Sequence, residues 1–179
     1  MLKKILIGLA VVLAVFVLVV ATRPADFRVT RSTVIAAPAD AVFPQVNELK
    51  KWAAWNPWEK MDPAMKLTYE GPAAGVGAAY AWAGNSDVGE GRLTITGSRT
   101  NEAVQLKLDF FKPMPGTSIA EFTFKPENNR TTVTWTISGK NNFIAKAFCL
   151  FVSMDKMIGG QFEQGLASLK TVAEAAGNK

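Results

Sequence analysis

The side chains that could carry acid–base chemistry are scattered along the chain and form no recognisable motif. The candidates are Glu90, Arg92, Asp109, Glu121, Tyr69 and Tyr80. Burial can raise the pKa of a carboxyl group until it acts as a general base, and an inward-facing tyrosine can polarise the carbonyl of a ligand. No two carboxylates stand at a spacing typical of paired acid–base catalysis, so we assign no catalytic residue.

Histidine is absent from the sequence and cysteine occurs once, at Cys149. Histidine is the usual general base near neutral pH, a member of catalytic triads and a common metal ligand. Its absence excludes Ser-His-Asp hydrolases, Cys-His proteases, His-ligated zinc enzymes and haem proteins with a proximal histidine. A single cysteine excludes an intramolecular disulfide and a Cys-X-X-Cys redox pair. We therefore expect no metal and no cofactor, and we expect Cys149 to be a small buried apolar residue.

The charge of the chain does not indicate a nucleic-acid partner. There are 20 Lys and Arg residues against 15 Asp and Glu, a net charge of +5. Lys3, Lys4 and Arg23 supply three of these charges at the N-terminus, so the rest of the chain carries only +2. Nucleic-acid binding needs basic residues concentrated in one patch or stripe, and no such stripe is present.

The N-terminus contains a long apolar segment. Residues 5–21 are uncharged, and only Gly8 falls outside the hydrophobic set. As a helix they would extend about 25 Å, slightly less than the roughly 30 Å of a bilayer core. We therefore expect residues 1–23 to form a single-pass membrane anchor and residues 24–179 to form one domain. A cleavable signal sequence remains the alternative, because Val19 and Ala21 suit a cleavage site before Thr22.

The orientation of this anchor follows weakly from its flanking charges. Lys3 and Lys4 on one side nearly balance Arg23, Arg28 and Arg31 on the other. The order of basic residues followed by an apolar segment favours an N-terminus in the cytoplasm. The domain would then lie outside the cytoplasm, in the periplasm if the cell is Gram-negative.

The rest of the chain predicts an α+β domain. Alternation in Val104, Leu106 and Leu108 against Gln105 and Lys107 is typical of an antiparallel sheet with one buried face. The predicted strands cover residues 26–36, 66–70, 78–83, 91–98, 103–111, 118–125 and 131–138. A short helix is expected over 40–51. One long amphipathic helix is expected from about 144 to 176, with a potential kink at 159–160, and it can bury its apolar stripe only against the sheet.

Several segments along the domain form a distinctive set. They are Val29-Thr30-Arg31-Ser32-Thr33-Val34-Ile35-Ala36-Ala37-Pro38, Trp55-Asn56-Pro57-Trp58, Gly75-Val76-Gly77-Ala78, Thr132-Val133-Thr134-Trp135 and Phe162-Glu163-Gln164-Gly165-Leu166. Together they resemble the START-like superfamily, in its polyketide cyclase/dehydrase-like (SRPBCC) branch. The resemblance implies a helix-grip fold, a curved seven-stranded antiparallel sheet around the long C-terminal helix. It also implies a cavity between them, which commonly receives an apolar small molecule. One departure is Asn47, where related chains often carry an acidic residue.

Aromatic residues are the candidate walls of that cavity. The predicted ligand-binding residues are Trp55, Trp58, Tyr80, Trp82, Phe110, Phe122, Trp135 and Phe162. Ligand pockets are mostly apolar, but aromatic residues also dominate ordinary cores, so both interpretations stay open. The glycine-rich segment 84–91 lacks the lysine of a phosphate-binding loop and the spacing of a calcium loop. We interpret it as a mobile hairpin, a gate at the cavity mouth.

Three functions are compatible with these patterns. The leading hypothesis is the binding or transport of a hydrophobic small molecule or lipid at the cell envelope. The first alternative is a metal-independent polyketide cyclase/dehydrase-like enzyme. The second is a protein-interaction domain resembling the chaperone-activating relatives of this fold, with a collapsed cavity and an exposed apolar patch around Trp52 to Trp58. A cavity below roughly 300 Å³ would argue against a small-molecule ligand.

Overall fold

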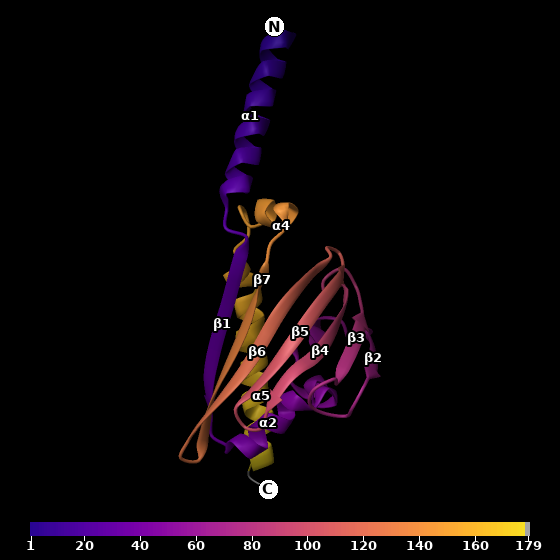
Figure 1. Cartoon of the computed structure of the whole chain (residues 1–179), viewed down its shortest axis with the longest axis vertical. Coiled ribbons are helices and arrows are strands. Elements are labelled where there is room, and N and C mark those ends of the chain that lie inside the picture. Colours follow the sequence, from indigo (N-terminus) through magenta and orange to yellow (C-terminus); the bar gives the residue numbers. More distant parts are fainter. Residues whose placement is uncertain (178–179) are drawn as a thin grey trace.

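The computed structural model describes residues 1–177 as one antiparallel sheet packed on a long helix, with a separate helix projecting from one end (Figure 1). The helices are α1 (Leu2–Thr22), α2 (Ala39–Asn47), the 3₁₀ helix η1 (Leu49–Ala54), α3 (Pro57–Met61), α4 (Phe143–Phe148) and α5 (Met154–Gly177). The strands are β1 (Asp26–Ile35), β2 (Lys66–Glu70), β3 (Ala79–Ala83), β4 (Glu90–Arg99), β5 (Ala103–Lys112), β6 (Gly116–Glu127) and β7 (Arg130–Lys140). This arrangement confirms the predicted α+β helix-grip fold.

The seven strands lie in the order β1-β7-β6-β5-β4-β3-β2, and every neighbouring pair is antiparallel. Strands β2 to β7 form a meander joined by short turns, and β1 adds to the sheet beside β7. The ends of each predicted strand lie within two residues of the observed ends. On β5, Val104 and Leu106 are buried while Gln105 and Lys107 are exposed, so the alternation places one face of the sheet against the core.

The short helices between β1 and β2 differ in detail from the expectation. The predicted helix over 40–51 ends at Asn47, because Glu48 adopts an extended conformation with φ −105° and ψ 101°. A 3₁₀ helix follows from Leu49. The side chain of Asn56 then caps α3 by accepting a hydrogen bond from the amide of Trp58. Asn47, the departure from the family pattern, accepts a hydrogen bond of 2.8 Å from Ser98 on β4.

The C-terminal region contains two helices, so the expectation of one continuous helix from 144 to 176 was wrong. Helix α4 begins at an Asn142 cap, which accepts a 2.9 Å hydrogen bond from Ala145 N. Helix α5 begins after Ser153, whose hydroxyl accepts from Lys156 N at 3.3 Å. The end of α4 at Phe148 and the Ser153 cap of α5 place the break at residues 149–153. Helix α5 continues through Gly159 and Gly160.

Helix α5 crosses the inner face of the sheet, and Arg31 of β1 holds its first turns. The Arg31 guanidinium forms ion pairs of 2.9 Å with Asp155 and 2.7 Å with Glu163. The hydrogen bonds from Arg31 hold the pKa of Asp155 below its usual range. Gly159 faces the same guanidinium, and a Cβ at this position would overlap it. An alanine at 159 would therefore require the Arg31 guanidinium to shift away from its two carboxylates.

The adjacent glycines of α5 allow a matched test of this close approach. We expect Gly160→Ala to raise the free energy of unfolding by about 1 kcal/mol, because alanine favours a helix and nothing lies within 4 Å of the added Cβ. Gly159→Ala should bring no such gain, because its Cβ displaces Arg31 from the two carboxylates. Urea unfolding of both variants measures the difference. Equal stabilisation by both substitutions would contradict the proposed constraint.

Candidate functional site

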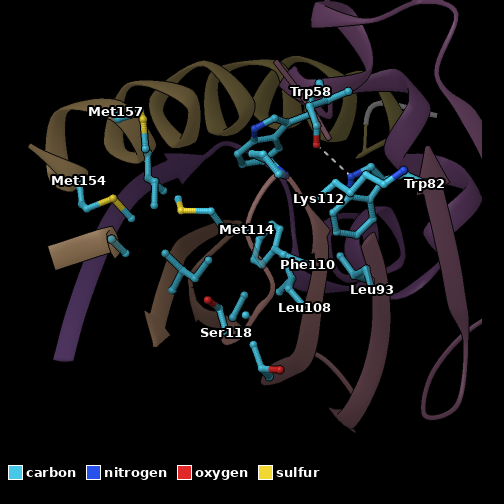
Figure 2. Close-up of a pocket in the computed structure, with 18 of the residues that line it drawn as sticks. Trp58, Trp82, Leu93, Leu108, Phe110, Lys112, Met114, Ser118, Met154 and Met157 are labelled. Carbon is cyan, nitrogen blue, oxygen red and sulfur yellow. Dashed lines mark hydrogen bonds between the residues drawn. The ribbon is translucent and has the colours of Figure 1, made fainter. Parts of the chain in front are cut away.

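A cavity of about 420 Å³ lies between the inner face of the sheet and the N-terminal half of α5 (Figure 2). Apolar side chains from β4, β5 and β7 form its floor, and Met154, Met157 and Phe162 of α5 form its roof. Its rim is formed by α4, by the β3–β4 turn and by the β5–β6 turn. Met114 and Met157 are exposed at this rim as well as lining the cavity, so the cavity opens to the outside there.

The aromatic residues predicted to bind a ligand divide into two groups. Trp58, Tyr80, Trp82, Phe110, Trp135 and Phe162 line the cavity. The other two, Trp55 and Phe122, are fully buried in the core and do not line it. Their rings lie against Trp135, with centroid distances of 5.7 Å for Trp55 and 4.6 Å for Phe122. They therefore support the wall from behind.

Trp135 is the central residue of the aromatic wall. Its ring stacks on Phe162 of α5, with centroids 3.9 Å apart and planes 8° apart, and on Phe122 of β6. Trp58 meets it edge-on at 5.8 Å. These contacts connect the sheet, α3 and α5 at the closed end of the cavity. Aromatic pairs of this geometry add stability beyond that of their burial.

A few polar groups interrupt the apolar lining. Asn56, Tyr80 and Ser118 are buried residues on the cavity wall. The indole Nε1 of Trp135 is buried and has no hydrogen-bond partner among the described residues. A buried donor without a partner is costly, and because this nitrogen has almost no accessible surface, a ligand in the cavity does not reach it. The cavity thus combines apolar walls with neutral polar groups that could orient one polar end of a ligand.

Tyr80 can act in this cavity as a hydrogen-bond donor but not as a base near neutral pH. Burial raises the pKa of its phenol well above the usual value, and the charge of Glu59 raises it further. The hydroxyl therefore keeps its proton. Burial also raises the pKa of Glu59 itself.

The remaining acid–base candidates do not line the cavity. Glu90 pairs with Lys112 at 2.8 Å, and Arg92 pairs with Glu70 at 2.8 Å. Asp109 pairs with Lys107. Burial favours the neutral acid of Asp109, but hydrogen bonds from Thr117 and Lys107 outweigh this and lower its pKa. Glu121 accepts a hydrogen bond from Gln105, and Tyr69 packs against Tyr80 from β2.

The sequence analysis missed most of the cavity rim. Met114 on the β5–β6 turn lies opposite Met154 and Met157 at the start of α5, and Figure 2 shows the three side chains pointing toward one another. Cys149 is partly exposed at the end of α4 and lines the cavity, so the expectation of a buried core residue was wrong. The break between α4 and α5 brings Cys149, Met154 and Met157 to the rim.

The segment 84–91 contributes to the rim as a turn between β3 and β4. Ser86, Asp87 and Val88 line the cavity. Trp82 Nε1 donates a 3.1 Å hydrogen bond to the carbonyl of Val88, and Asp62 accepts one of 2.7 Å from Asn85 N. The position agrees with the predicted gate, and its mobility stays a prediction.

The curved antiparallel sheet, the long helix that it grips and the apolar cavity between them define a helix-grip protein with an internal ligand-sized cavity. The chain belongs to the family described as "Polyketide cyclase / dehydrase and lipid transport", whose sequence pattern matches residues 26–174. No curated protein matches the chain.

Solved structures confirm the fold across most of the chain. Protein CV1439 from Chromobacterium violaceum is 16% identical, with a TM-score of 0.59 over 85% of this chain and 99% of that chain. Mll3558 from Rhizobium loti is 18% identical, with a TM-score of 0.57 over 86% and 99%. Ara h 8.0201 is 7% identical, with a TM-score of 0.52 over 84% and 96%. At these identities the likeness extends to the fold alone.

The two tyrosines provide a test of the polarity of the cavity. Because burial raises the pKa of Tyr80, the neutral phenol stabilises the fold fully below the unfolded pKa of about 10, and this contribution falls as the pH rises further. In a Tyr69→Phe variant the only remaining tyrosine is Tyr80. We expect it to ionise only as the protein unfolds in alkali, measured by ultraviolet difference absorbance beside circular dichroism. Reversible ionisation near pH 10 in the folded protein would show that the phenol is hydrated.

Proposed function

We propose that the protein binds a hydrophobic small molecule or lipid in this cavity and that it does so without catalysis. The observation that carries the proposal is the cavity itself, whose volume of about 420 Å³ exceeds the roughly 300 Å³ at which ligand pockets begin. Family membership supports the same class of ligand. Each methylene group that leaves water for such a cavity contributes about 0.8 kcal/mol, so an alkyl chain is a well-matched occupant.

The polar groups of the cavity favour a ligand with one polar end. Tyr80 offers a hydrogen-bond donor, Ser118 a hydroxyl and Asn56 an amide. The ligand we propose is therefore amphipathic, with its apolar part along Leu108 and Phe110 and its polar end toward α3.

The two alternative functions find less support. A cyclase-like enzyme would need a proton acceptor inside the cavity. Tyr80 keeps its proton, and Glu90, Arg92 and Asp109 form ion pairs elsewhere. The carboxylate of Asp87 lines the cavity only at its rim, where the residue is exposed. The protein-interaction hypothesis expected a collapsed cavity and an exposed apolar patch around Trp52 to Trp58. Trp52 and Trp55 are instead buried, so that expectation was wrong.

We further propose that α1 anchors the domain in a membrane. It is a 21-residue helix containing an 18-residue window with a mean hydropathy of 3.1, and its side chains are exposed apart from Val20. At 1.5 Å per residue it extends about 31 Å, the thickness of a bilayer core. A cleavable signal sequence has the same composition. The charge order at Lys3 and Lys4 favours a domain on the extracytoplasmic side.

Filling the cavity should abolish ligand retention. We expect Leu108→Trp to remove the bound molecule, because the indole occupies the space between β5 and α5. Lys107→Trp is the matched control, since it places the same side chain on the opposite, exposed face of the same strand. Native mass spectrometry of the full-length protein released from nanodiscs detects the retained molecule. A wild-type protein without any lipid or fatty-acid adduct would contradict the proposed function.

The orientation of the anchor can be measured with fusions after Lys179. We expect alkaline phosphatase, which is active only outside the cytoplasm, to be active there, and green fluorescent protein to be dark when exported by the same route. Replacing Lys3 and Lys4 by Glu should reduce the phosphatase activity, because the cytoplasmic retention signal is lost. Activity confined to the cytoplasmic reporter would reverse the proposed orientation.

A further inference from the structure

Helix α4 and the turn after it carry an apolar surface with no partner among the described residues. We define the α4 surface as Phe143, Ile144, Phe148 and Phe151, all of which are exposed, Ile144 by 67% and Phe151 by 81%. Large apolar side chains gathered in one short segment of surface mark an interaction site.

The α4 surface lies at the end of α1. Lys146 Nζ donates a 3.0 Å hydrogen bond to the carbonyl of Ala21, and Val20 in the last turn of α1 is fully buried. Figure 1 shows α4 lying across the base of α1, at the end of the sheet from which α1 projects. The chain between Thr22 and Asp26 can reach at most roughly 14 Å. If α1 spans a bilayer, α4 therefore lies at its surface.

Basic residues accompany the apolar ones at this end of the domain. Arg23 and Lys146 line a recess of about 210 Å³ between α1 and α4, and Lys140 lies on the adjoining wall of the main cavity. A lysine or arginine near an anionic membrane surface contributes about 1 kcal/mol of attraction. Apolar residues flanked by cations are typical of segments that lie in a membrane interface.

The same segment forms the cavity rim. Phe148 and Cys149 of α4 line the cavity on one side, and Met114 lines it on the other. Methionine side chains are flexible and allow such a rim to adapt to what passes. The cavity mouth, the α4 surface and the end of α1 therefore share one end of the molecule.

We propose that the α4 surface inserts into the bilayer that holds α1, so that the cavity mouth opens onto lipid. A ligand then moves between bilayer and cavity without crossing water. The occupant of the α4 surface is the lipid bilayer itself, because its apolar side chains continue the exposed apolar surface of α1 and its cations match anionic headgroups. This inference rests on the proposed anchor, and it holds whether or not the cavity retains a ligand.

Site-directed fluorescence on the full-length chain tests this docking. In a Cys149→Ser background, the environment-sensitive probe NBD is attached at Ile144→Cys, at Phe151→Cys or, as control, at Val34→Cys on an exposed position of β1 far from α1. The proteins are reconstituted into phosphatidylethanolamine–phosphatidylglycerol vesicles whose acyl chains carry nitroxide. We expect several-fold stronger quenching at 144 and 151 than at 34.

A charged substitution separates insertion of the protein from insertion of the probe alone. With the probe at 151, Ile144→Glu should strongly reduce the quenching, because it places a carboxylate in the inserted surface. Ile119→Glu on the exposed face of β6 is the matched control and should leave the quenching unchanged.

Three results would overturn the inference. In the first, the protein is anchored, but aqueous iodide quenches the probes at 144 and 151 as strongly as the probe at 34. This result contradicts insertion of the α4 surface and leaves the proposed anchor intact. Protection from both iodide and lipid nitroxide assigns the α4 surface to a second copy of the chain. Failure of the full-length protein to float with the vesicles removes the anchor and the docking together, without bearing on the mass-spectrometric test of the cavity.

Discussion

The stack of Phe122, Trp135 and Phe162 is the contact on which the rest of the structure depends, because it sets how closely α5 approaches the sheet. Beyond Phe162, toward the C-terminus, Leu166, Leu169 and Ala173 are buried and fill the space completely. Before Phe162, the space under Met154 and Met157 remains open and forms the cavity. The stack thus divides α5 into two parts: the part after Phe162 packs directly on the sheet, and the part before it, the raised half, is separated from the sheet by the cavity.

Two further contacts position α5 on either side of this stack. On the packed side, Gly165 lets the helix come close to Trp135, since a Cβ there would lie 2.9 Å from the indole ring. Arg31 fixes the first turns to β1 through two carboxylates, and these partly exposed ion pairs determine position more than they add stability. The cavity is thus kept open by the Arg31 ion pairs outside its lining and by the Trp135–Phe162 stack at one end of it, so its other walls can be apolar and only sparsely hydrogen-bonded.

Alternation and turn residues were sufficient to predict the sheet, because the apolar residues that alternate along each strand identify its buried face without information from the rest of the chain. The break between α4 and α5 was missed because the apolar spacing through Phe148 and Phe151 continues across it, although Ser153 was available as a cap residue. The inner-facing aromatic residues were also identified. Whether such a residue lines the cavity or packs in the core depends on the distance between α5 and the sheet, which long-range contacts determine. The sequences of β3 and β6 alone therefore could not show that Trp82 lines the cavity and that Phe122 lies in the core.

The break in the C-terminal helix also determines where the cavity opens. One continuous helix would have carried Phe148 and Phe151 along the sheet, where burial in the core would have closed the space above Phe110. With the chain turned at residues 149–153, Phe151 is exposed, and Phe148 is half exposed while it lines the cavity. Met114, Met154 and Met157 lie around the same opening. Because the tether to α1 is only three residues long, the domain cannot turn its mouth far from the surface at which α1 ends. The position of the opening relative to α1 is therefore a consequence of chain geometry. With α1 in a membrane and a ligand in the cavity, as we propose, this position favours exchange of the ligand with the membrane over exchange with water.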